Sequence, residues 1–324
     1  MSTFKIGIIG SGGMARHHLQ RFSSIEKVGI VAITSRNRDT GTHLADEYKT
    51  SYISDWQQLL DNDVLEGIVI CTHNDSHGEI ALKALESGKH VFVEYPLANN
   101  ISQAEEAINL AKACNLILRV SHPEVVSNNH QSLKKKTKAL GDLLLSSFTR
   151  LTPRRGTRPE ILFNLSVSGI PAHFFIYHIY PIVDLFGEPA WVEGAACYEG
   201  LTETGQYNRF VNTVTIVFKQ GGIGQWSWAG GIDINESQQH QRYVLTNGSL
   251  INDGDGWYCS TVDGVTELKV SKTPQPSLQE LWLTEIQASK YSEPNYNDVD
   301  VALSAIKISL AAEQSIQEDR RIEL

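Results

Sequence analysis

The sequence has few cysteines and no long apolar run. Its four cysteines lie far apart among 324 residues and form no C-x-x-C pair. This spacing excludes a disulfide framework and a zinc ribbon, and it indicates reduced thiols in a cytosolic protein. No apolar run approaches the roughly 18 residues that a membrane helix needs. The N-terminus leads directly into FKIGIIG, which is typical of a first strand and not of a cleavable leader. We therefore expect a cytoplasmic protein without a metal site or a membrane partner.

Positive charge is also scarce. Lys and Arg number 28 against 37 Asp and Glu, which leaves a formal net charge of −9. Such a charge argues against nucleic acid or an anionic membrane as the main partner. Hydrophobic residues make up 41% of the chain and charged residues 20%, an ordinary globular composition, and the length indicates two domains. We expect a small-molecule substrate.

The N-terminal third of the chain alternates between short apolar runs and segments of helical length. The runs are KIGIIG, VGIVAIT, EGIVICT, KHVFVEY and LILRVS. Strands separated by helices form a parallel sheet covered on both faces. Ser102, followed by Glu105, predicts a capping box at the start of one of these helices. We predict an α/β Rossmann domain over residues 1–121.

The turn after the first strand reads GSGGMA at residues 10–15, the G-x-G-x-x-[GA] form. Gly10 would permit the tight turn, Gly12 would let the backbone approach a pyrophosphate, and Ala15 would keep helix and strand close. The alternative is a tight turn without a ligand. Because the motif follows a strand and opens a helix, we prefer a dinucleotide site that includes Gly10, Gly12, Gly13 and Met14.

The end of the second strand predicts which dinucleotide binds. NAD-selective sites usually place an acidic residue there to hold the ribose 2′-hydroxyl. This chain has Ser35 and Arg36 in the stretch AITSRNR at 32–38. A hydroxyl and a guanidinium suit a 2′-phosphate, so we predict NADP(H). The alternative is that Arg36 and Arg38 are simply exposed in a loop.

Several stretches resemble the glucose–fructose oxidoreductase and inositol dehydrogenase (GFO/IDH/MocA) family. They are GIIGSGGMA at the start, the block at 71–98, DLFGEP at 184–189 and YNDVDVALSAIKISLAAEQSIQ near the end. The resemblance implies a Rossmann domain followed by a domain with a large open sheet, and a homo-oligomer. Where the family reads T-P-x-x-x-H, this chain has Thr72, His73 and His77, which we expect at the cofactor.

The strand end at residues 94–96 departs from most of that family. Members that oxidise sugars or cyclitols carry E-K-P there, with the lysine beside the nicotinamide. This chain has Glu94, Tyr95 and Pro96. An ordinary tyrosine has a pKa of about 10, close to that of lysine, but its acid is neutral and its base is charged. We therefore expect Glu94 to meet the cofactor and Tyr95 to mark a different reaction or substrate.

E-Y-P resembles the biliverdin reductases, a branch of the same superfamily. The stretches 168–189, 118–126 and 242–250 are also similar to that branch. Two positions depart from it. His178 stands where those enzymes have a helix arginine that is a candidate proton donor to the bilin, and Ser121 replaces the acidic residue before the loop histidine, here His122.

From about residue 122 the pattern changes to strands with period-two alternation and Gly or Asn-Gly turns. This predicts an α+β domain over 122–324 with a large, open, mostly antiparallel sheet. One face would cover a helix at 172–186, and the other would face solvent or a partner subunit.

Helical periodicity over 172–186 predicts one stripe formed by His173, Tyr177, Tyr180 and Asp184. Pro181 would bend this helix. We interpret Tyr180 as core. The resemblance places Tyr177 and His178 at active-site positions of the family, so we expect them to be active-site residues. For His173 both interpretations stay open.

Four arginines cluster in RLTPRRGTR at 150–158. They form either a solvated loop or a clamp for carboxylates, such as the propionates of a bilin.

The function we infer is hydride transfer from NADPH to a conjugated acceptor, with a bilin as the candidate substrate. The candidate catalytic residues are Tyr95, His122, His173, Tyr177 and His178. His178 leads as proton donor, because an imidazole titrates near neutral pH. Two alternatives stay open: reduction or oxidation of a sugar, cyclitol or small carbonyl compound, and a non-catalytic protein that binds NADPH or a bilin.

Overall fold

The computed structural model describes residues 3–154 and 158–324, which form two compact units. The first unit contains the chain up to Pro123 together with Pro276–Leu303, and the second contains Glu124–Gln275 and Ser304–Leu324. Among the described residues, no helix combines the length and the apolar character that crossing a bilayer requires. Arg155, one of the four clustered arginines, lies outside the described residues.

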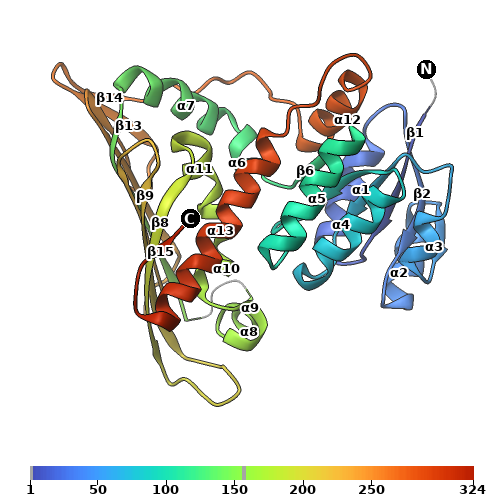
Figure 1. Cartoon of the computed structure of the whole chain (residues 1–324), viewed down its shortest axis with the longest axis horizontal. Coiled ribbons are helices and arrows are strands. Elements are labelled where there is room, and N and C mark those ends of the chain that lie inside the picture. The colour runs from blue at the N-terminus through green and yellow to red at the C-terminus, as the bar shows by residue number, and fades with distance from the viewer. Residues whose placement is uncertain (1–2, 155–157) are drawn as a thin grey trace. The chain divides into compact units, whose positions relative to one another are not determined.

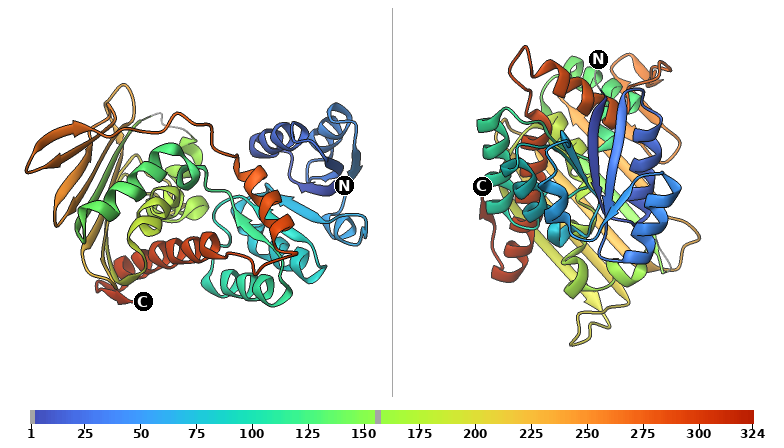
Figure 2. Two further views of the ribbon diagram at one scale, coloured as in Figure 1. Left: turned by 90° about the horizontal axis from the view of Figure 1, so that it is seen from above. Right: turned by 90° about the vertical axis from the view of Figure 1, so that its right-hand side faces the viewer.

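The first unit is built on six parallel strands in the order β3-β2-β1-β4-β5-β6. The strands are β1 (Phe4–Ile9), β2 (Val28–Thr34), β3 (Ser51–Ile53), β4 (Gly67–Ile70), β5 (His90–Val93) and β6 (Leu118–Val120). The helices α1 (Gly13–Ser23), α2 (Arg38–Glu47), α3 (Trp56–Leu60), α4 (His77–Glu86) and α5 (Ile101–Cys114) alternate with them and lie on both faces of the sheet (Figures 1 and 2). The predicted Rossmann architecture is confirmed.

The strand order reverses between β1 and β4, which are neighbours in the sheet although β2 and β3 intervene in the chain. Open α/β sheets bind ligands at the carboxyl ends of the strands at such a reversal. The turn after β1 and the loop after β4 both begin at this edge, because the two strands are parallel. This edge is therefore where the sequence motifs of the first unit come together.

The helix α5 begins two residues earlier than its sequence predicts. Its N-cap is Asn100, whose side-chain oxygen accepts a hydrogen bond from the Gln103 amide at 2.8 Å. Ser102 already lies inside the helix, so the capping box predicted there is wrong. Asn and Ser are both good N-cap residues, and the prediction rested on Ser102 alone.

Residues 276–303 belong to the first unit and not, as we predicted, to the second. Helix α12 (Leu278–Ala288) carries Trp282, which is fully buried. Its ring lies 5.8 to 5.9 Å from the rings of Phe4, Phe22 and Phe92. A large aromatic cluster of this kind stabilises the packing of α12, but its members are distant in sequence.

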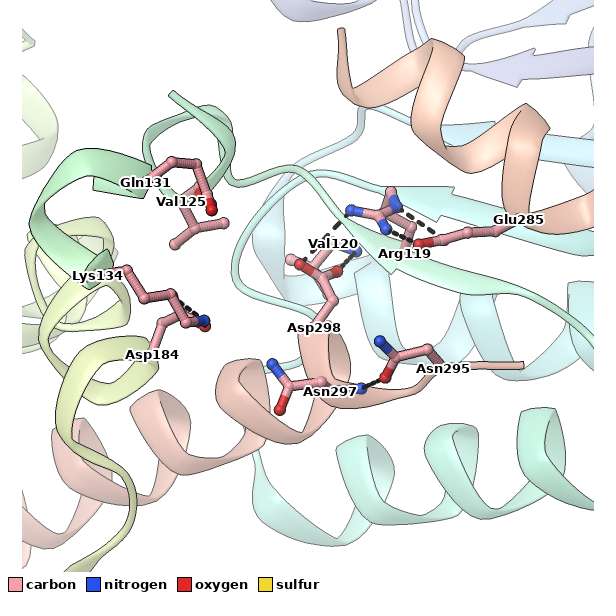
Figure 3. A network of polar contacts seen from close by, with 10 residues as sticks. All are labelled: Arg119, Val120, Val125, Gln131, Lys134, Asp184, Glu285, Asn295, Asn297 and Asp298. Carbon is pink, nitrogen blue, oxygen red and sulfur yellow. Dashed lines mark hydrogen bonds and ion pairs between the residues drawn. The ribbon is translucent and has the colours of Figure 1, made fainter. Parts of the chain in front are cut away.

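An ion-pair network holds the same segment to β6 (Figure 3). Arg119 is buried and donates to the Glu285 carboxylate, with Nε 3.2 Å from Oε2. Asp298 lies 3.8 Å from the Arg119 guanidinium and accepts a hydrogen bond from the Val120 amide at 3.1 Å. Two carboxylates thus compensate one buried cation, as a buried charge requires.

The second unit is built on a mixed sheet in the order β14-β13-β12-β11-β7-β10-β9-β8-β15. The strands are β7 (Leu143–Pro153), β8 (Pro189–Glu199), β9 (Arg209–Phe218), β10 (Ile223–Ile232), β11 (Gln238–Leu245), β12 (Gly248–Asn252), β13 (Trp257–Thr261), β14 (Gly264–Glu267) and β15 (Ile322–Glu323). Only β7 and β10, among the described pairs, are parallel. The predicted mostly antiparallel sheet is confirmed.

Helices cover one face of this sheet, and Figure 2 shows the other face without helices. The covering helices include α7 (Asn128–Leu140), α10 (Pro171–Phe174), α11 (Tyr180–Phe186) and the later part of α13 (Asn297–Glu318) (Figure 1). The strand residues Trp226 and Trp228 are fully buried. This helix-covered face therefore forms the core of the second unit.

The helix predicted over 172–186 is not continuous. It is divided into α10, a 3-10 turn at Ile176–His178 (η2), and α11. Pro181 stands in the first turn of α11 and has no amide to bond the carbonyl of Tyr177, so one regular helix cannot pass through this point. The predicted stripe is wrong in detail, because its spacing assumed an unbroken helix.

Candidate active site

The candidate residues fall into two sets, one in each unit. The first set starts at the glycine turn after β1. Gly10 has a φ of +131°, and a Cβ there would lie 2.4 Å from the Cys71 carbonyl oxygen. Only glycine can adopt this backbone at so close an approach. Gly10 therefore fixes the turn, as predicted from the motif.

Gly12 is different, because no described atom lies within 4 Å of a Cβ placed there. It is the N-cap of α1, and no described side chain caps this helix end. The amides of the first turn are thus available to an anion, and the absence of a Cβ keeps the space over them open. Gly13 has the same open space, and Met14 is partly exposed beside it. This cradle fits the pyrophosphate of a dinucleotide.

A cluster of hydroxyl groups stands at the end of β2. Ser11 Oγ lies 2.6 Å from Ser35 Oγ and 2.7 Å from Thr40 Oγ1. Arg36 is exposed next to this cluster, and among the described residues it forms no ion pair. Hydroxyl donors beside an unpaired guanidinium suit the ribose and a 2′-phosphate. The sequence predicted Ser35 and Arg36; it did not single out Ser11 or Thr40.

His77 is the first residue of α4 and bridges the loops that follow β4 and β5. It is buried, and its Nδ1 lies 2.8 Å from the Pro96 carbonyl oxygen while Nε2 lies 3.2 Å from that of Thr72. Burial lowers the pKa of this imidazole, which favours the neutral ring. His77 therefore shapes the edge where Thr72 lies, whereas His73 is exposed at the start of the following turn.

Glu94 is held by a buried histidine. Its Oε1 lies 2.6 Å from His18 Nε2, and His18 Nδ1 lies 2.8 Å from Gln279 Nε2. If the Gln279 amide nitrogen donates to Nδ1, the imidazole carries its proton on Nε2. Nε2 then donates a hydrogen bond to the Glu94 carboxylate. The sequence predicted Glu94 at the cofactor, but it gave no signal for this arrangement, because 261 residues separate His18 from Gln279.

Tyr95 and His122 lie together at the ends of β5 and β6. Their rings stack with centroids 5.4 Å apart and an interplanar angle of 29°. His122 is buried, and burial holds its pKa well below the ordinary range. The imidazole is therefore neutral at physiological pH, and Tyr95 is half-buried beside it. Two candidate catalytic residues are thus brought into contact.

In the second unit, Tyr177 and His178 lie over the helix-covered face of the sheet, with ring centroids 4.2 Å apart. Trp228 Nε1 donates to His178 Nδ1 at 3.1 Å, which places the imidazole proton on Nε2. Burial, followed by the nearby Arg150 guanidinium, lowers the pKa of His178 well below its ordinary value. The sequence ranked His178 first as proton donor because histidine titrates near neutrality; in this environment that reason does not hold.

The remaining helix residues have partners or are buried. His173 Nε2 lies 3.1 Å from Glu313 Oε2, and this hydrogen bond lowers the pKa of the Glu313 carboxyl. Tyr180 is buried in the core, as we expected. Asp184 accepts hydrogen bonds from His130 and Lys134; Figure 3 shows the latter contact, whose distances are 2.8 and 2.9 Å.

The described arginines of the cluster, Arg150, Arg154 and Arg158, do not act as one group. Arg154 pairs with Asp233 at 3.0 Å, and both side chains are largely exposed. Arg158 is exposed at the start of a short helix. Arg150 is half-buried on β7 and approaches Tyr177 and His178 closely enough to influence their pKa values.

The chain is similar to proteins of known activity over part of its length. It is 29% identical over 198 residues to a scyllo-inositol 2-dehydrogenase (NADP(+)) of Bacillus subtilis. It is 28% identical over 191 residues to a 4-carboxy-2-hydroxymuconate-6-semialdehyde dehydrogenase of a Sphingobium species. Each match covers 57% of this chain and 59% of the relative.

The fold is similar to solved structures over nearly the whole chain. A biliverdin reductase from Synechocystis, solved with biliverdin and NADP+, has a TM-score of 0.82 at 21% identity and covers 98% of this chain and 100% of its own. An oxidoreductase domain protein from Kribbella flavida has a TM-score of 0.82 at 18% identity, covering 100% and 99%. At these identities the likeness shows the fold alone.

The family comparison agrees with the geometry of the glycine turn. Residues 4–122 match the oxidoreductase family with an NAD-binding Rossmann fold, GFO/IDH/MocA. This match lies within the first unit and concerns its Rossmann domain.

Proposed function

We propose that the protein is an NADPH-dependent oxidoreductase that reduces a conjugated acceptor, in the manner of the biliverdin reductases. The observation that carries the proposal is the half-buried Tyr95 stacked on His122, at the position where the sugar-oxidising members have a lysine. The NADP+ and biliverdin bound in the Synechocystis enzyme support this choice.

The first unit would hold the cofactor. The α1 amides over Gly12 would bind the pyrophosphate, and Ser35 with Arg36 would bind a 2′-phosphate. Bound NADPH would supply the hydride. Glu94, held by His18, would accept hydrogen bonds at the edge where β5 ends. Of these residues, Ser35 and Arg36 would give the unit a preference for NADPH over NADH.

The tyrosines are the groups best suited to handle a proton. His122 and His178 are both neutral at physiological pH because of burial, so neither stores a proton for transfer. Burial raises the pKa of Tyr177, which keeps its hydroxyl protonated. Within the first unit, the hydroxyl of Tyr95 would donate a hydrogen bond to an acceptor that gains charge; Tyr177 is a separate candidate donor within the second unit.

The test is turnover of biliverdin with NADPH, followed by bilirubin absorbance and by loss of NADPH absorbance. We expect turnover by the unaltered protein, and at least a tenfold lower kcat for Tyr95→Phe, since general-acid groups contribute roughly 10²–10⁴-fold. NADPH binding by Tyr95→Phe should be unchanged. No reduction of biliverdin or of a related bilin would refute the substrate assignment.

A second candidate function is oxidation or reduction of a cyclitol, sugar or small carbonyl compound. The similarity to the scyllo-inositol and semialdehyde dehydrogenases favours it. Under this function Tyr95→Lys should retain or raise activity on such substrates, whereas bilin reduction should be lost. Tight NADPH binding without turnover of either substrate class would instead indicate a non-catalytic protein.

We also propose that the protein is cytoplasmic and forms a homo-oligomer. Sedimentation would test the oligomeric state.

A further inference from the structure

Arg150 occupies an unusual place in the second unit. It lies in the middle of β7, paired with Trp228 on β10 and with Gln239 on β11. Phe148 and Thr152, two residues to either side and therefore on the same face, are buried. Arg150 thus projects from the helix-covered face and is half-buried there.

The guanidinium of Arg150 is poorly compensated. Its nearest hydrogen-bond acceptors are neutral, Gln239 Oε1 and Ser237 Oγ, each at 3.5 Å, which is the outer limit for such a bond. Its Nε is buried and has no hydrogen-bond partner among the described residues. Within the same described set, no Asp or Glu forms an ion pair with it, whereas Arg154 pairs with Asp233 and Arg209 with Glu199.

A partly desolvated cation without an anion is costly. Proteins normally place a carboxylate beside such a group, as the first unit does for Arg119. The N–H donors of the Arg150 guanidinium are therefore suited to bind an anionic group of a ligand.

Aromatic rings hold the guanidinium in place. It packs 5.6 Å from the centroid of the Phe175 ring. Phe175 in turn stacks on His178, with centroids 5.3 Å apart, and on Trp228 at 6.1 Å. This stack orients the planar fork and leaves a flat apolar surface around it.

We propose that Arg150 binds a carboxylate of the substrate by a bidentate contact, with the neighbouring aromatic rings against the adjoining flat part of the molecule. A single guanidinium matches the charge of one carboxylate, whereas a phosphate dianion usually requires a second cation. The inference rests on the proposed function, which it deepens by requiring an anionic substrate.

The test is calorimetric titration with benzoate, with its neutral isostere benzamide, and with phenyl phosphate. The proteins are the unaltered chain, Arg150→Met and Arg150→Lys. The control is Arg154→Met, which removes a guanidinium from the surface pair with Asp233. Circular dichroism checks the fold of each variant. NADPH is titrated separately, so that failure of the cofactor site is distinguished from failure of this one.

We expect the unaltered protein to bind benzoate at least tenfold more tightly than benzamide. Arg150→Met should weaken benzoate binding by roughly tenfold to hundredfold, the range of a charge-assisted hydrogen bond. Arg154→Met should bind benzoate with the affinity of the unaltered protein. The affinity of Arg150→Lys should lie between those of the unaltered protein and Arg150→Met. Equal affinity for benzoate and benzamide, no benzoate binding, or normal binding by Arg150→Met would overturn the proposal. So would tighter binding of phenyl phosphate than of benzoate. If Arg150→Met does not fold, the affinities of Arg150→Lys for benzoate and benzamide test the proposal instead.

Discussion

The substitution Gly12→Ala separates the fold of the glycine turn from its ligand. A Cβ at Gly12 would meet no described atom within 4 Å, and the residue has an ordinary extended backbone. Alanine is a poorer N-cap than glycine by about 0.5–1 kcal/mol. Loss of glycine's freedom in the unfolded chain stabilises by about 0.4–1 kcal/mol. The two effects nearly cancel, so the free energy of unfolding should change by less than about 1 kcal/mol.

The same methyl group should interfere with a bound pyrophosphate. A phosphate oxygen that accepts from the first-turn amides lies about 2.9 Å from the nitrogen. The added carbon needs about 3.5 Å from that oxygen, so the phosphate must move away and at least one charge-assisted hydrogen bond is lost. Such a bond is worth about 1.5–3 kcal/mol, which corresponds to roughly 10- to 100-fold in the Kd for NADPH.

The assay is calorimetric titration with NADPH, together with thermal unfolding in its absence. Gly13→Ala is the comparison variant: Gly13 lines the same open space, with no described atom within 4 Å of an added Cβ, but it is not one of the motif glycines. It should lose less affinity than Gly12→Ala. Gly10→Ala should instead unfold at lower temperature, because its Cβ would overlap the Cys71 carbonyl oxygen at 2.4 Å. Normal NADPH binding by Gly12→Ala would refute the placement of the pyrophosphate.

Three further predictions concern the first unit. Arg36→Ala should raise the KM for NADPH by roughly tenfold or more and leave that for NADH nearly unchanged, since only the former has a 2′-phosphate; equal effects on both cofactors would contradict the predicted preference. His18→Phe should destabilise the first unit by about 3–5 kcal/mol, because it leaves the buried Glu94 carboxylate without its partner, and adding Glu94→Gln should restore part of this loss in hydrogen-exchange protection. Burial lowers the pKa of His90 to about 4, and its Nδ1 accepts from the Ile117 amide at 2.9 Å. Because the folded pKa lies below the unfolded value near 6.5, this contribution to stability is complete above pH 6.5 and is lost as the pH falls toward 4, by up to about 3 kcal/mol; His90→Gln should flatten that part of the stability curve.

Local patterns predicted the parts of the fold that local interactions determine. The alternation of apolar runs with helical segments and the GSGGMA turn contain their own structural reasons within a few residues. The strand-to-turn passage at Glu94–Tyr95 was predictable for the same reason. The expected stripe over 172–186 was not reliable, because Pro181 interrupts the helix on which the spacing depends.

Contacts between distant segments could not be predicted in this way. Trp282 packs with rings from β1, α1 and β5. Residues 276–303 therefore belong to the first unit, although they follow most of the second unit in the sequence. The environment of Arg150 depends on strand pairing with β10 and β11, which alternation within one strand does not reveal. The same holds for His178, whose protonation depends on burial and on Trp228.

Direct titration with NADPH tests the central claim of the account, that the glycine turn of the first unit holds a pyridine nucleotide. We predict saturable binding, energy transfer from tryptophan to the bound nicotinamide, and weaker binding of NADH. The absence of any saturable signal from NADPH or NADH, by calorimetry and by fluorescence, would contradict it.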